Sequence, residues 1–225
     1  MCGKKKLVIV GAGETAALAY EYFTYDSDFE VVAFAVDKEY LRDDTFCDLP
    51  LISIDDMPKD YPADGNYAFC ALGSGELNRQ RTRVFNRIKA AGYKCASYVS
   101  SKAFVWQNVS IGENCLILEN NVLQPFTAVG DNVVMWSGNH VGHRSTIGNN
   151  AFVTSHVVIS GFCSVGENSF LGVNSCLADN TSIGSDNFIA MGSCITRTTG
   201  NDEVYRGNPA MKMKLSAKVF CGVKD

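Results

Sequence analysis

The sequence lacks the features that mark nucleic-acid binders and membrane proteins. It has no basic excess, because its 20 lysines and arginines are outnumbered by 24 aspartates and glutamates. A nucleic-acid-binding chain would show such an excess or a basic stripe. The longest apolar stretches, such as residues 31–36, are far shorter than the roughly 20 residues that a helix needs to span a bilayer. We therefore expect neither nucleic acid nor a membrane among the partners of this chain.

The sequence also lacks a secretion signal and any paired-cysteine motif. The basic N-terminal segment runs directly into Gly11-Ala12-Gly13, without the apolar region and cleavage site of a signal peptide. No two cysteines have the Cys-x-x-Cys spacing of a zinc knuckle or a dithiol redox motif. An odd number of cysteines without a secretion signal predicts reduced, mostly packed thiols in a cytoplasmic protein. The nine cysteines are Cys2, Cys47, Cys70, Cys95, Cys115, Cys163, Cys176, Cys194 and Cys221.

What the sequence does contain is a repeat of six residues in its second half. From Ile111 to Ile195 every sixth residue is Leu, Ile, Val or Met, without one insertion in the register. A strict period of this kind predicts a solenoid, in which stacked repeats bury one continuous aliphatic core. The residue four positions after each aliphatic is almost always small or short; examples are Cys115, Thr127, Asn139, Ser145, Ala151, Cys163 and Ser169.

A second period of 18 residues lies on top of the first. Every third hexad opens with Ile-Gly or Val-Gly followed by polar residues, at positions 111, 129, 147, 165 and 183. The chain therefore closes one coil per three hexads, with three short strands per coil and Gly, Asn or Asp at the tight corners. Each coil is expected to hydrogen-bond to the next at a spacing of about 4.8 Å. The period resembles that of the hexapeptide-repeat family, and this resemblance implies a left-handed parallel β-helix.

The first hundred residues follow a different pattern, in which apolar strands alternate with helical segments. This alternation predicts a small parallel sheet with crossover helices, a Rossmann-like α/β domain. We place that domain at residues 1–100, the β-helix at 101–203 and a C-terminal tail at 204–225. Strands are predicted at 6–10, 29–36 and 67–72, and helices from the turn at 11–16 to about Tyr25 and over 77–92.

The turn after the first strand has the fingerprint G-x-G-x-x-A, which indicates a nucleotide site. Glycines at a strand-to-helix turn, here Gly11 and Gly13, let a phosphate approach the N–H groups at the positive end of the helix. Asp37, at the end of the second strand, can bind a ribose hydroxyl, and Gly73 and Ser74 follow the third strand. About 100 residues hold only half of a doubly wound dinucleotide domain. A mononucleotide, such as the nucleoside diphosphate of an activated sugar, therefore fits better; a tight turn packed under a helix is the structural alternative.

The only three histidines, His140, His143 and His156, all lie in the middle coils of the repeat. The inward positions belong to the aliphatic and small residues, so we expect the imidazoles to point outward, where subunits or ligands meet. Imidazole titrates near neutral pH and can take a proton from an attacking amine or hydroxyl.

The segment from Asn139 to Gly148, which contains His140 and His143, makes the resemblance more specific. Nearly the whole chain is similar to bacterial nucleotide-sugar acetyltransferases: the bacillosamine- and perosamine-type N-acetyltransferases and their sialic-acid O-acetyltransferase relatives. The resemblance implies a short nucleotide-binding domain, a left-handed β-helix and a homotrimer with active sites between subunits. It also implies acetyl-CoA as co-substrate, because Asn-Pro-Ala at 208–210 is typical of hexapeptide acyltransferases.

The same resemblance assigns roles to individual residues. In the family a histidine four residues ahead of an Ile-Gly corner is the base, and His143 holds that place. The 18-residue period places Gly161 directly above His143, where a glycine leaves room for a thioester and can present its N–H to the oxyanion. The phosphates of CoA are expected near the C-terminal end, where they would suit the cations Arg197, Arg206, Lys212 and Lys214. Asn208, Pro209 and Ala210 are further candidate CoA-binding residues.

One position departs from the family pattern. An acid commonly lies beside the catalytic histidine, but here the next residue is Arg144, a cation that disfavours the protonated imidazole. Asn139, His140 or an acid from another subunit could orient His143, and His140 is an alternative base. His156 matches no position of the family.

We therefore expect N-acetylation of an amino group on a nucleotide-linked deoxy sugar, with O-acetylation of a sugar or sialic acid as the near alternative. Both reactions need a base, a thioester slot and a sugar pocket. Trimeric β-helix carbonic anhydrases bind zinc through three histidines, but the additional nucleotide-type domain and the Asn-Pro-Ala ending do not fit that family, so we expect no metal. A non-catalytic nucleotide-binding scaffold is a further alternative. Outward aromatic residues such as Trp136 and Phe152 support the trimer.

Overall fold

The computed structural model describes residues 4–224, so Cys2 lies outside the described part of the chain. Its contacts divide the chain into two units. The first unit contains residues up to 73 and residues 81–98, and the second contains residues 74–80 and everything from Val99 onward. The division falls close to the boundary expected at residue 100, but it groups the short segment 74–80 and the tail with the repeat. No helix among residues 4–224 is long and apolar enough to cross a membrane.

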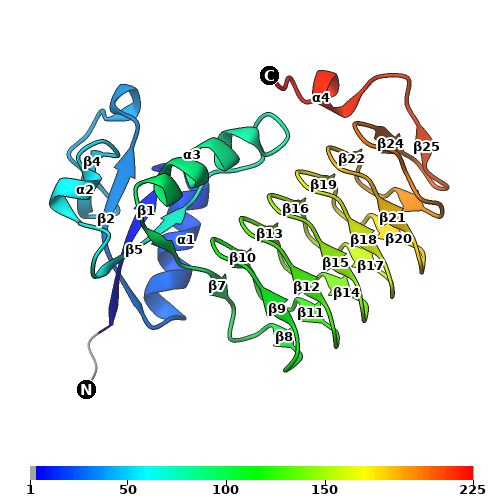
Figure 1. Cartoon of the computed structure of the whole chain (residues 1–225), viewed down its shortest axis with the longest axis horizontal. Coiled ribbons are helices and arrows are strands. Elements are labelled where there is room, and N and C mark those ends of the chain that lie inside the picture. The colour runs from blue at the N-terminus through cyan, green and yellow to red at the C-terminus, as the bar shows by residue number, and fades with distance from the viewer. Residues whose placement is uncertain (1–3, 225) are drawn as a thin grey trace. The chain divides into compact units, whose positions relative to one another are not determined.

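The first unit is built on a parallel sheet with the strand order β3-β4-β2-β1-β5-β6 (Figure 1). All of its strands are parallel except β3, which pairs antiparallel with β4. Residues 7–10 are buried because both faces of a parallel sheet are covered. The strands are β1 (Lys5–Val10), β2 (Phe29–Val36), β3 (Thr45–Phe46), β4 (Leu49–Ser53), β5 (Asn66–Cys70) and β6 (Lys94–Cys95), and the helices are α1 (Glu14–Tyr25), η1 (Lys38–Tyr40), α2 (Met57–Asp60) and most of α3 (Arg79–Ala90).

The strands predicted at 6–10, 29–36 and 67–72 correspond to β1, β2 and β5. The sequence prediction missed β3, β4 and α2. Each of these is at most five residues long, too short for an apolar period to stand out.

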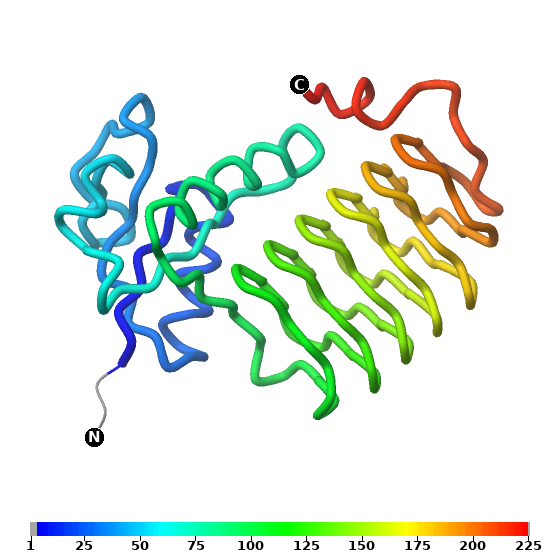
Figure 2. Tube along the Cα trace, in the orientation of Figure 1, coloured from blue at the N-terminus to red at the C-terminus, as the bar shows by residue number. Residues whose placement is uncertain are grey.

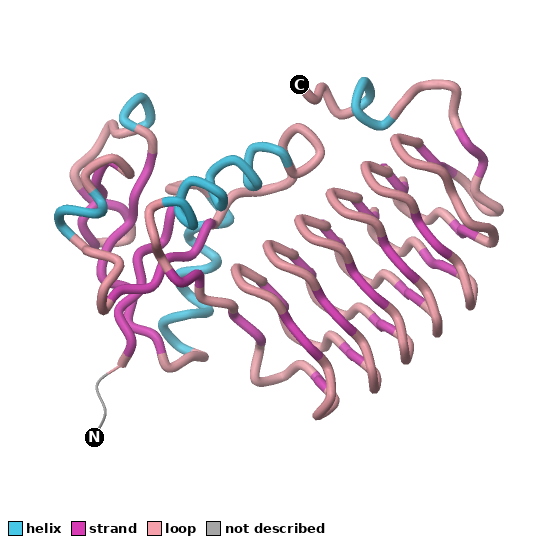
Figure 3. Tube along the Cα trace, viewed as in Figure 1, coloured by secondary structure: helices cyan, strands magenta, loops and turns pink. Residues whose placement is uncertain are grey.

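The second unit is a parallel β-helix with three faces. Two-residue strands alternate with corners along the whole repeat (Figure 3), and successive coils stack side by side from green to orange in Figure 2. Face 1 contains β7 (Tyr98–Val99), β10 (Leu116–Ile117), β13 (Val134–Met135), β16 (Phe152–Val153), β19 (Phe170–Leu171), β22 (Phe188–Ile189), β24 (Val204–Arg206) and β25 (Met211–Lys212). Face 2 contains β8 (Phe104–Val105), β11 (Val122–Leu123), β14 (His140–Val141), β17 (Val158–Ile159), β20 (Cys176–Leu177) and β23 (Cys194–Ile195). Face 3 contains β9 (Ser110–Ile111), β12 (Ala128–Val129), β15 (Thr146–Ile147), β18 (Ser164–Val165) and β21 (Ser182–Ile183).

The hexad aliphatics from 117 to 195 form one buried core inside this β-helix. Residues 18 apart pair across neighbouring parallel strands, so that His140 lies between Val122 and Val158 on face 2. The repeat begins earlier than the sequence prediction had it, because Val99 and Val105 continue the same register and pack against the core. The Ile-Gly corner that marks later coils is missing there, which hid them from the pattern.

Side chains on the outside of face 1 pack within the second unit. Phe152, Phe170 and Phe188 stack in a row with ring centroids 5.6 and 4.8 Å apart. Leu77, from the segment 74–80, is buried with Val204 and with helix α4 (Ala217–Phe220) against this row. Phe152 is only 7% exposed in the single chain, so the expectation that it supports a subunit contact is wrong. Trp136 is partly exposed.

Replacing Leu171 by Ala tests the aliphatic column. Leu171 is fully buried in the core of the β-helix, so the change should lower the free energy of unfolding by about 2–5 kcal/mol, as cavities in cores do. The matched control is Val173, two residues further on and 40% exposed. Val173→Ala should change the free energy of unfolding by no more than about 0.5 kcal/mol. Urea unfolding followed by circular dichroism measures both. Equal losses in the two variants would contradict a single inward column.

Candidate active site

The candidate active site is the corner between faces 2 and 3 that carries His143. Val141 points into the core from β14, and the chain then turns through Gly142, His143 and Arg144. A methyl group on Gly142 would lie 2.5 Å from the Gly161 nitrogen of the next coil, so only glycine fits there. Arg144 has a φ of +58°, which completes the turn. The His143 side chain is consequently exposed on the outside of the β-helix.

Neighbouring coils hold the His143 corner from both sides. The backbone N–H of His143 donates to Gln124 Oε1 of the preceding coil at 2.9 Å. In the following coil the Phe162 ring meets the imidazole edge to face, with centroids 4.9 Å apart. The preceding coil therefore holds the His143 backbone, and the following coil contacts its imidazole.

Gly161 lies directly against the His143 imidazole. A methyl group built on Gly161 would be 2.8 Å from Cε1 and 3.2 Å from Nδ1 of His143, so any larger side chain would displace the ring. The 18-residue period places these two residues on top of one another, and the structure has them in contact.

The backbone N–H of Gly161 is engaged, however. It donates to Oδ1 of Asp179, one coil further on, at 2.8 Å. An oxyanion could therefore bind the Gly161 N–H only in place of the Asp179 carboxylate. The same arrangement caps the corners after face 3, where the Glu113 N–H donates to Asp131 and the Asp131 N–H donates to Asn149. An aspartate or asparagine 18 residues after a corner amide thus satisfies that amide repeatedly in this β-helix.

Arg144 is directed toward the preceding coil. Its guanidinium carbon lies 4.5 Å from the centre of the Phe126 ring, a cation–π contact. Phe126 and Phe162 are each more than half exposed, so the cation and two aromatic rings line the same corner as His143.

Asn139 does not belong to this corner, contrary to the expectation that it orients His143. Its side chain is 1% exposed and lies in a ladder of inward asparagines. Its Nδ2 donates to Asn121 Oδ1 at 2.9 Å, and its Oδ1 accepts from the Val157 N–H at 2.7 Å. Those bonds close the corner between faces 1 and 2 and leave the amide no direction toward His143.

The other two histidines lie elsewhere on the β-helix. His140 is partly buried in strand β14 on face 2, and His156 is at the corner between faces 1 and 2. A methyl group on Gly138 would be 2.6 Å from the His156 Nδ1, so that imidazole rests on a glycine of the preceding coil. Within residues 4–224 of one chain, no three His, Cys, Asp or Glu side chains gather as a metal site.

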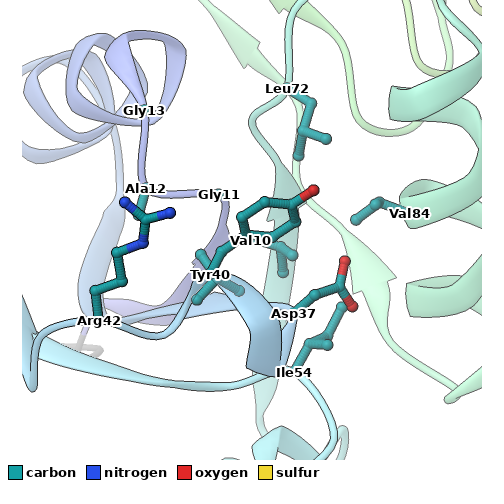
Figure 4. Close-up of a pocket in the computed structure, with 11 residues that line it drawn as sticks. Val10, Gly11, Ala12, Gly13, Asp37, Tyr40, Arg42, Ile54, Leu72 and Val84 are labelled. Carbon is teal, nitrogen blue, oxygen red and sulfur yellow. The ribbon is translucent and has the colours of Figure 1, made fainter.

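The first unit has a cavity of about 460 Å³ at the turn after β1 (Figure 4). Gly11, Gly13 and Asp37, predicted from the sequence, all line it. Gly11 has a φ of +134°, and a methyl group there would lie 2.8 Å from the Ala71 carbonyl oxygen. Gly13 is the N-cap of α1 without a side-chain cap, and a methyl group added to it would meet open space. The positive end of the helix is therefore accessible from the cavity.

Two lining residues escaped the sequence prediction, Tyr40 and Arg42. Figure 4 shows the Arg42 guanidinium beside the loop at Ala12 and Gly13, with the Tyr40 ring in the middle of the cavity. The neighbouring Glu39 carboxylate raises the pKa of Tyr40, so its hydroxyl remains protonated at neutral pH. No short motif marks these residues in the sequence, because they follow β2 in an irregular connection.

The predicted residues Asp37, Gly73 and Ser74 have further contacts in this region. Asp37, which lines the cavity, is ion-paired with Arg87 of α3, which also pairs with Asp55. Gly73 and Ser74 are not among the residues that line the cavity; their carbonyl groups accept hydrogen bonds from Arg81 and from the Asn78 N–H, respectively.

A second cavity, of about 390 Å³, lies at the C-terminal end of the β-helix. It is lined by Arg197, Pro209 and Ala210 of the predicted set, and by Tyr205, which the sequence did not single out. Arg206, Asn208 and Lys212 are exposed but do not line it. Among the predicted residues, the structure therefore brings together Arg197, Pro209 and Ala210.

Glu203 binds two other residues of the C-terminal tail beside this cavity. It accepts hydrogen bonds from Tyr205 at 2.7 Å and from Lys212. Burial and the Glu203 carboxylate raise the pKa of Tyr205 to about 12. Burial alone would raise the pKa of Glu203, but the hydrogen bonds from Lys212, Tyr205 and the Gly200 N–H outweigh it and lower the pKa below 4.5.

The lowered pKa of Glu203 predicts an acid-dependent loss of stability. An ionised Glu203 stabilises the folded state fully above its unfolded pKa near 4.5, and this contribution disappears as the pH falls through the lower folded pKa. Glu203→Gln cannot titrate, so between about pH 6 and pH 3 it should lose less unfolding free energy than the parent protein. Urea unfolding at several pH values measures this difference. Glu167→Gln, on the exposed side of a face 3 corner, is the control and should follow the parent curve.

The chain was compared with protein families and with solved structures, and both comparisons gave matches. Residues 163–197 match the family described as the hexapeptide repeat of succinyl-transferase. The acetyltransferase domain of PglB from Neisseria gonorrhoeae superposes with a TM-score of 0.84 at 21% identity, covering 93% of this chain and 100% of that one. PerB from Caulobacter crescentus, solved with CoA and GDP-perosamine, superposes with a TM-score of 0.81 at 22% identity, covering 95% and 98%.

A further structure of the PglB domain contains acetyl coenzyme A and has a TM-score of 0.80 at 19% identity, covering 94% of this chain and 100% of that one. The comparison with curated protein sequences gave no match. The solved structures agree with the left-handed β-helix expected from the repeat. The chain therefore shares the fold of these solved acetyltransferase structures, and part of it matches a hexapeptide repeat.

Proposed function

We propose that this protein is an acetyl-CoA-dependent N-acetyltransferase that modifies an amino group on a nucleotide-linked deoxy sugar, with His143 as the general base. The observation that carries the proposal is the His143 corner: an exposed imidazole in contact with Gly161, on a fold shared with enzymes solved with CoA and GDP-perosamine. Two further structures of that perosamine enzyme carry asparagine or alanine in place of a histidine, also with CoA and GDP-perosamine.

The residues of the corner suit acetyl transfer. An amine that attacks a thioester must lose a proton, and the exposed His143 imidazole can accept it. The Gly161 N–H already holds an anionic oxygen of Asp179 at 2.8 Å. In the proposed reaction the thioester oxygen replaces Asp179 Oδ1 at this amide, so that the N–H stabilises the tetrahedral oxyanion. The leaving CoA sulfur then takes the proton from the imidazolium.

The two cavities supply separate binding sites in this proposal. The nucleoside diphosphate occupies the cavity of the first unit, where its phosphates meet the N-terminus of α1 and Arg42. The phosphates of CoA lie near Arg197 and the exposed Arg206. We also propose a homotrimer with active sites between subunits, since Phe104, Phe126, Val158 and Phe162 expose apolar surface on face 2 and on the His143 corner.

The decisive experiment replaces His143 by Asn. Purified full-length protein is incubated with acetyl-CoA and a panel of amino- and hydroxy-sugar nucleotides, and the release of free thiol is measured. His143→Asn should lower kcat on amino-sugar nucleotides by about 10²–10⁴-fold, because the base is lost, and should leave the assembly unchanged in size-exclusion chromatography. His156→Asn, an exposed histidine at another corner, is the matched control. Turnover that survives His143→Asn would contradict the base assignment, and thiol release with hydroxy sugars alone would favour O-acetylation.

The cavity of the first unit generates a separate prediction. Removing the guanidinium in Arg42→Ala should raise the KM for the nucleotide sugar about tenfold or more, since a charge-assisted contact with phosphate is lost. The kcat and the KM for acetyl-CoA should stay within about twofold, because the reacting groups are untouched. Lys38→Ala, an exposed cation four residues away that does not line the cavity, is the control. A KM that is unchanged in Arg42→Ala would place the nucleotide elsewhere.

A further inference from the structure

Two cysteine thiols meet on the outer side of face 2, although no sequence motif connects them. Cys176 of β20 and Cys194 of β23 are directly paired in the register of these parallel strands. Their sulfur atoms are 3.1 Å apart, with the Cys176 thiol donating to Cys194 Sγ. Both side chains are partly exposed. A spacing of 18 residues hides the pair from any search for neighbouring cysteines.

The geometry of the two strands permits a covalent bond between these sulfurs. Neighbouring strands in a sheet are about 4.8 Å apart, and a disulfide joins Cα atoms that are about 4.4–6.8 Å apart. Directly paired residues on adjacent strands therefore fall in the allowed range. Cys163, in contrast, lies in the inner core, where its thiol bonds to carbonyl groups.

The chemistry of the pair assigns different roles to its two members. Burial and the hydrogen bond to Cys194 raise the pKa of Cys176 to about 11, so Cys176 keeps its proton at neutral pH. That thiol points at Cys194 Sγ. Since the thiolate is the reactive form and Cys176 holds its proton, Cys176 is the resolving thiol and the attack on the oxidant is assigned to Cys194.

The backbone of Cys194 also supports the wall of the C-terminal cavity. Its N–H donates to the Gly207 carbonyl at 3.1 Å, and its carbonyl accepts from the Ala210 N–H at 2.9 Å. Ile195, the next residue, lines the cavity together with Ala210. Two backbone hydrogen bonds therefore connect Cys194 to the segment that carries Pro209 and Ala210.

We propose that Cys176 and Cys194 form an oxidisable dithiol, which hydrogen peroxide converts into an intramolecular disulfide and which thereby weakens ligand binding in the C-terminal cavity. The dithiol chemistry stands by itself, whereas its effect on CoA rests on the proposed function.

The oxidation proceeds in two balanced steps. The Cys194 thiolate attacks one oxygen of the peroxide, the O–O bond breaks, and the leaving hydroxide takes a proton to become water, which leaves a sulfenic acid on Cys194. The Cys176 sulfur then attacks the Cys194 sulfur and loses its proton, and the sulfenic oxygen leaves as a second water. The two thiols lose two electrons in total, and the peroxide gains them.

The first measurement detects the bond. Reduced full-length protein is treated with hydrogen peroxide, its remaining free thiols are alkylated, and it is cleaved after Asp and Glu. Glu167, Asp179 and Asp186 separate Cys163, Cys176 and Cys194 into different peptides, which trypsin cannot do because residues 145–196 contain no Lys or Arg. We expect a linked pair of peptides containing Cys176 and Cys194, lighter by two hydrogens than the reduced pair and released by dithiothreitol.

Three variants provide the controls for the bond. Cys176→Ser and Cys194→Ser should each abolish the linked peptides, and Cys176→Ser should leave a sulfenic acid on Cys194 that dimedone traps. Cys47→Ser, a partly exposed cysteine outside the pair, should leave the linkage intact. If one serine variant does not fold, the other and the parent protein decide the result. Absence of the Cys176–Cys194 linkage in the peroxide-treated parent protein would overturn the proposal.

The second measurement tests the effect on the cavity. Calorimetry with CoA should give a Kd at least about tenfold weaker for the oxidised than for the reduced parent protein. Reduction with dithiothreitol should restore the affinity, and Cys194→Ser should not respond to peroxide. Equal affinities of the oxidised and reduced protein would overturn the effect on the cavity. If the reduced protein binds no CoA, the proposed function fails. The linked peptides still show whether Cys176 and Cys194 form a disulfide.

Discussion

The stacking of one coil on the next, at a constant interval of 18 residues, is the constraint on which the rest of the second unit depends. Each two-residue strand is too short to be stable alone, and each coil buries its aliphatic side chains only against the coils beside it. A single residue inserted into one coil would have to loop out, because otherwise it would break the alignment of the coils before it with those after it. The chain keeps the interval without interruption from Ile111 to Ile195, and this regularity gives every corner a defined neighbour above and below it.

The candidate active site follows from that regularity. His143 rests on Gly161 because the two positions are 18 apart, and Gly161 must lack a side chain because the imidazole occupies the space where one would be. The same interval pairs Cys176 with Cys194 and allows Asp179 to cap the Gly161 amide. One geometric rule thus produces an exposed imidazole in contact with a glycine, an amide that binds a carboxylate oxygen, and a pair of neighbouring thiols.

The tail and the segment 74–80 show how residues outside the repeat complete the second unit. The stacked rings of Phe170 and Phe188 would expose apolar surface on face 1, and Leu77 and helix α4 pack against them. To pack there, the segment 74–80 adopts positive φ at three consecutive residues, Glu76, Leu77 and Asn78. The cost of that conformation is offset by the burial of Leu77 and by hydrogen bonds from Asn78 to the carbonyl groups of Asn168 and Ser169.

The sequence alone determined the β-helix, its period and the contact of His143 with Gly161, because a strict repeat converts distance along the chain into distance in space. It also determined the glycine turn after β1, since Gly11 and Gly13 meet local backbone requirements. Only the tertiary structure decided which side chains meet or are buried. It shows that the Gly161 N–H donates to Asp179 and that Asn139 bonds to Asn121 in a ladder. It also shows that Phe152 is buried and that Tyr40 and Arg42 line a cavity. These outcomes depend on side-chain directions and on irregular connections, for which a periodic pattern contains no information.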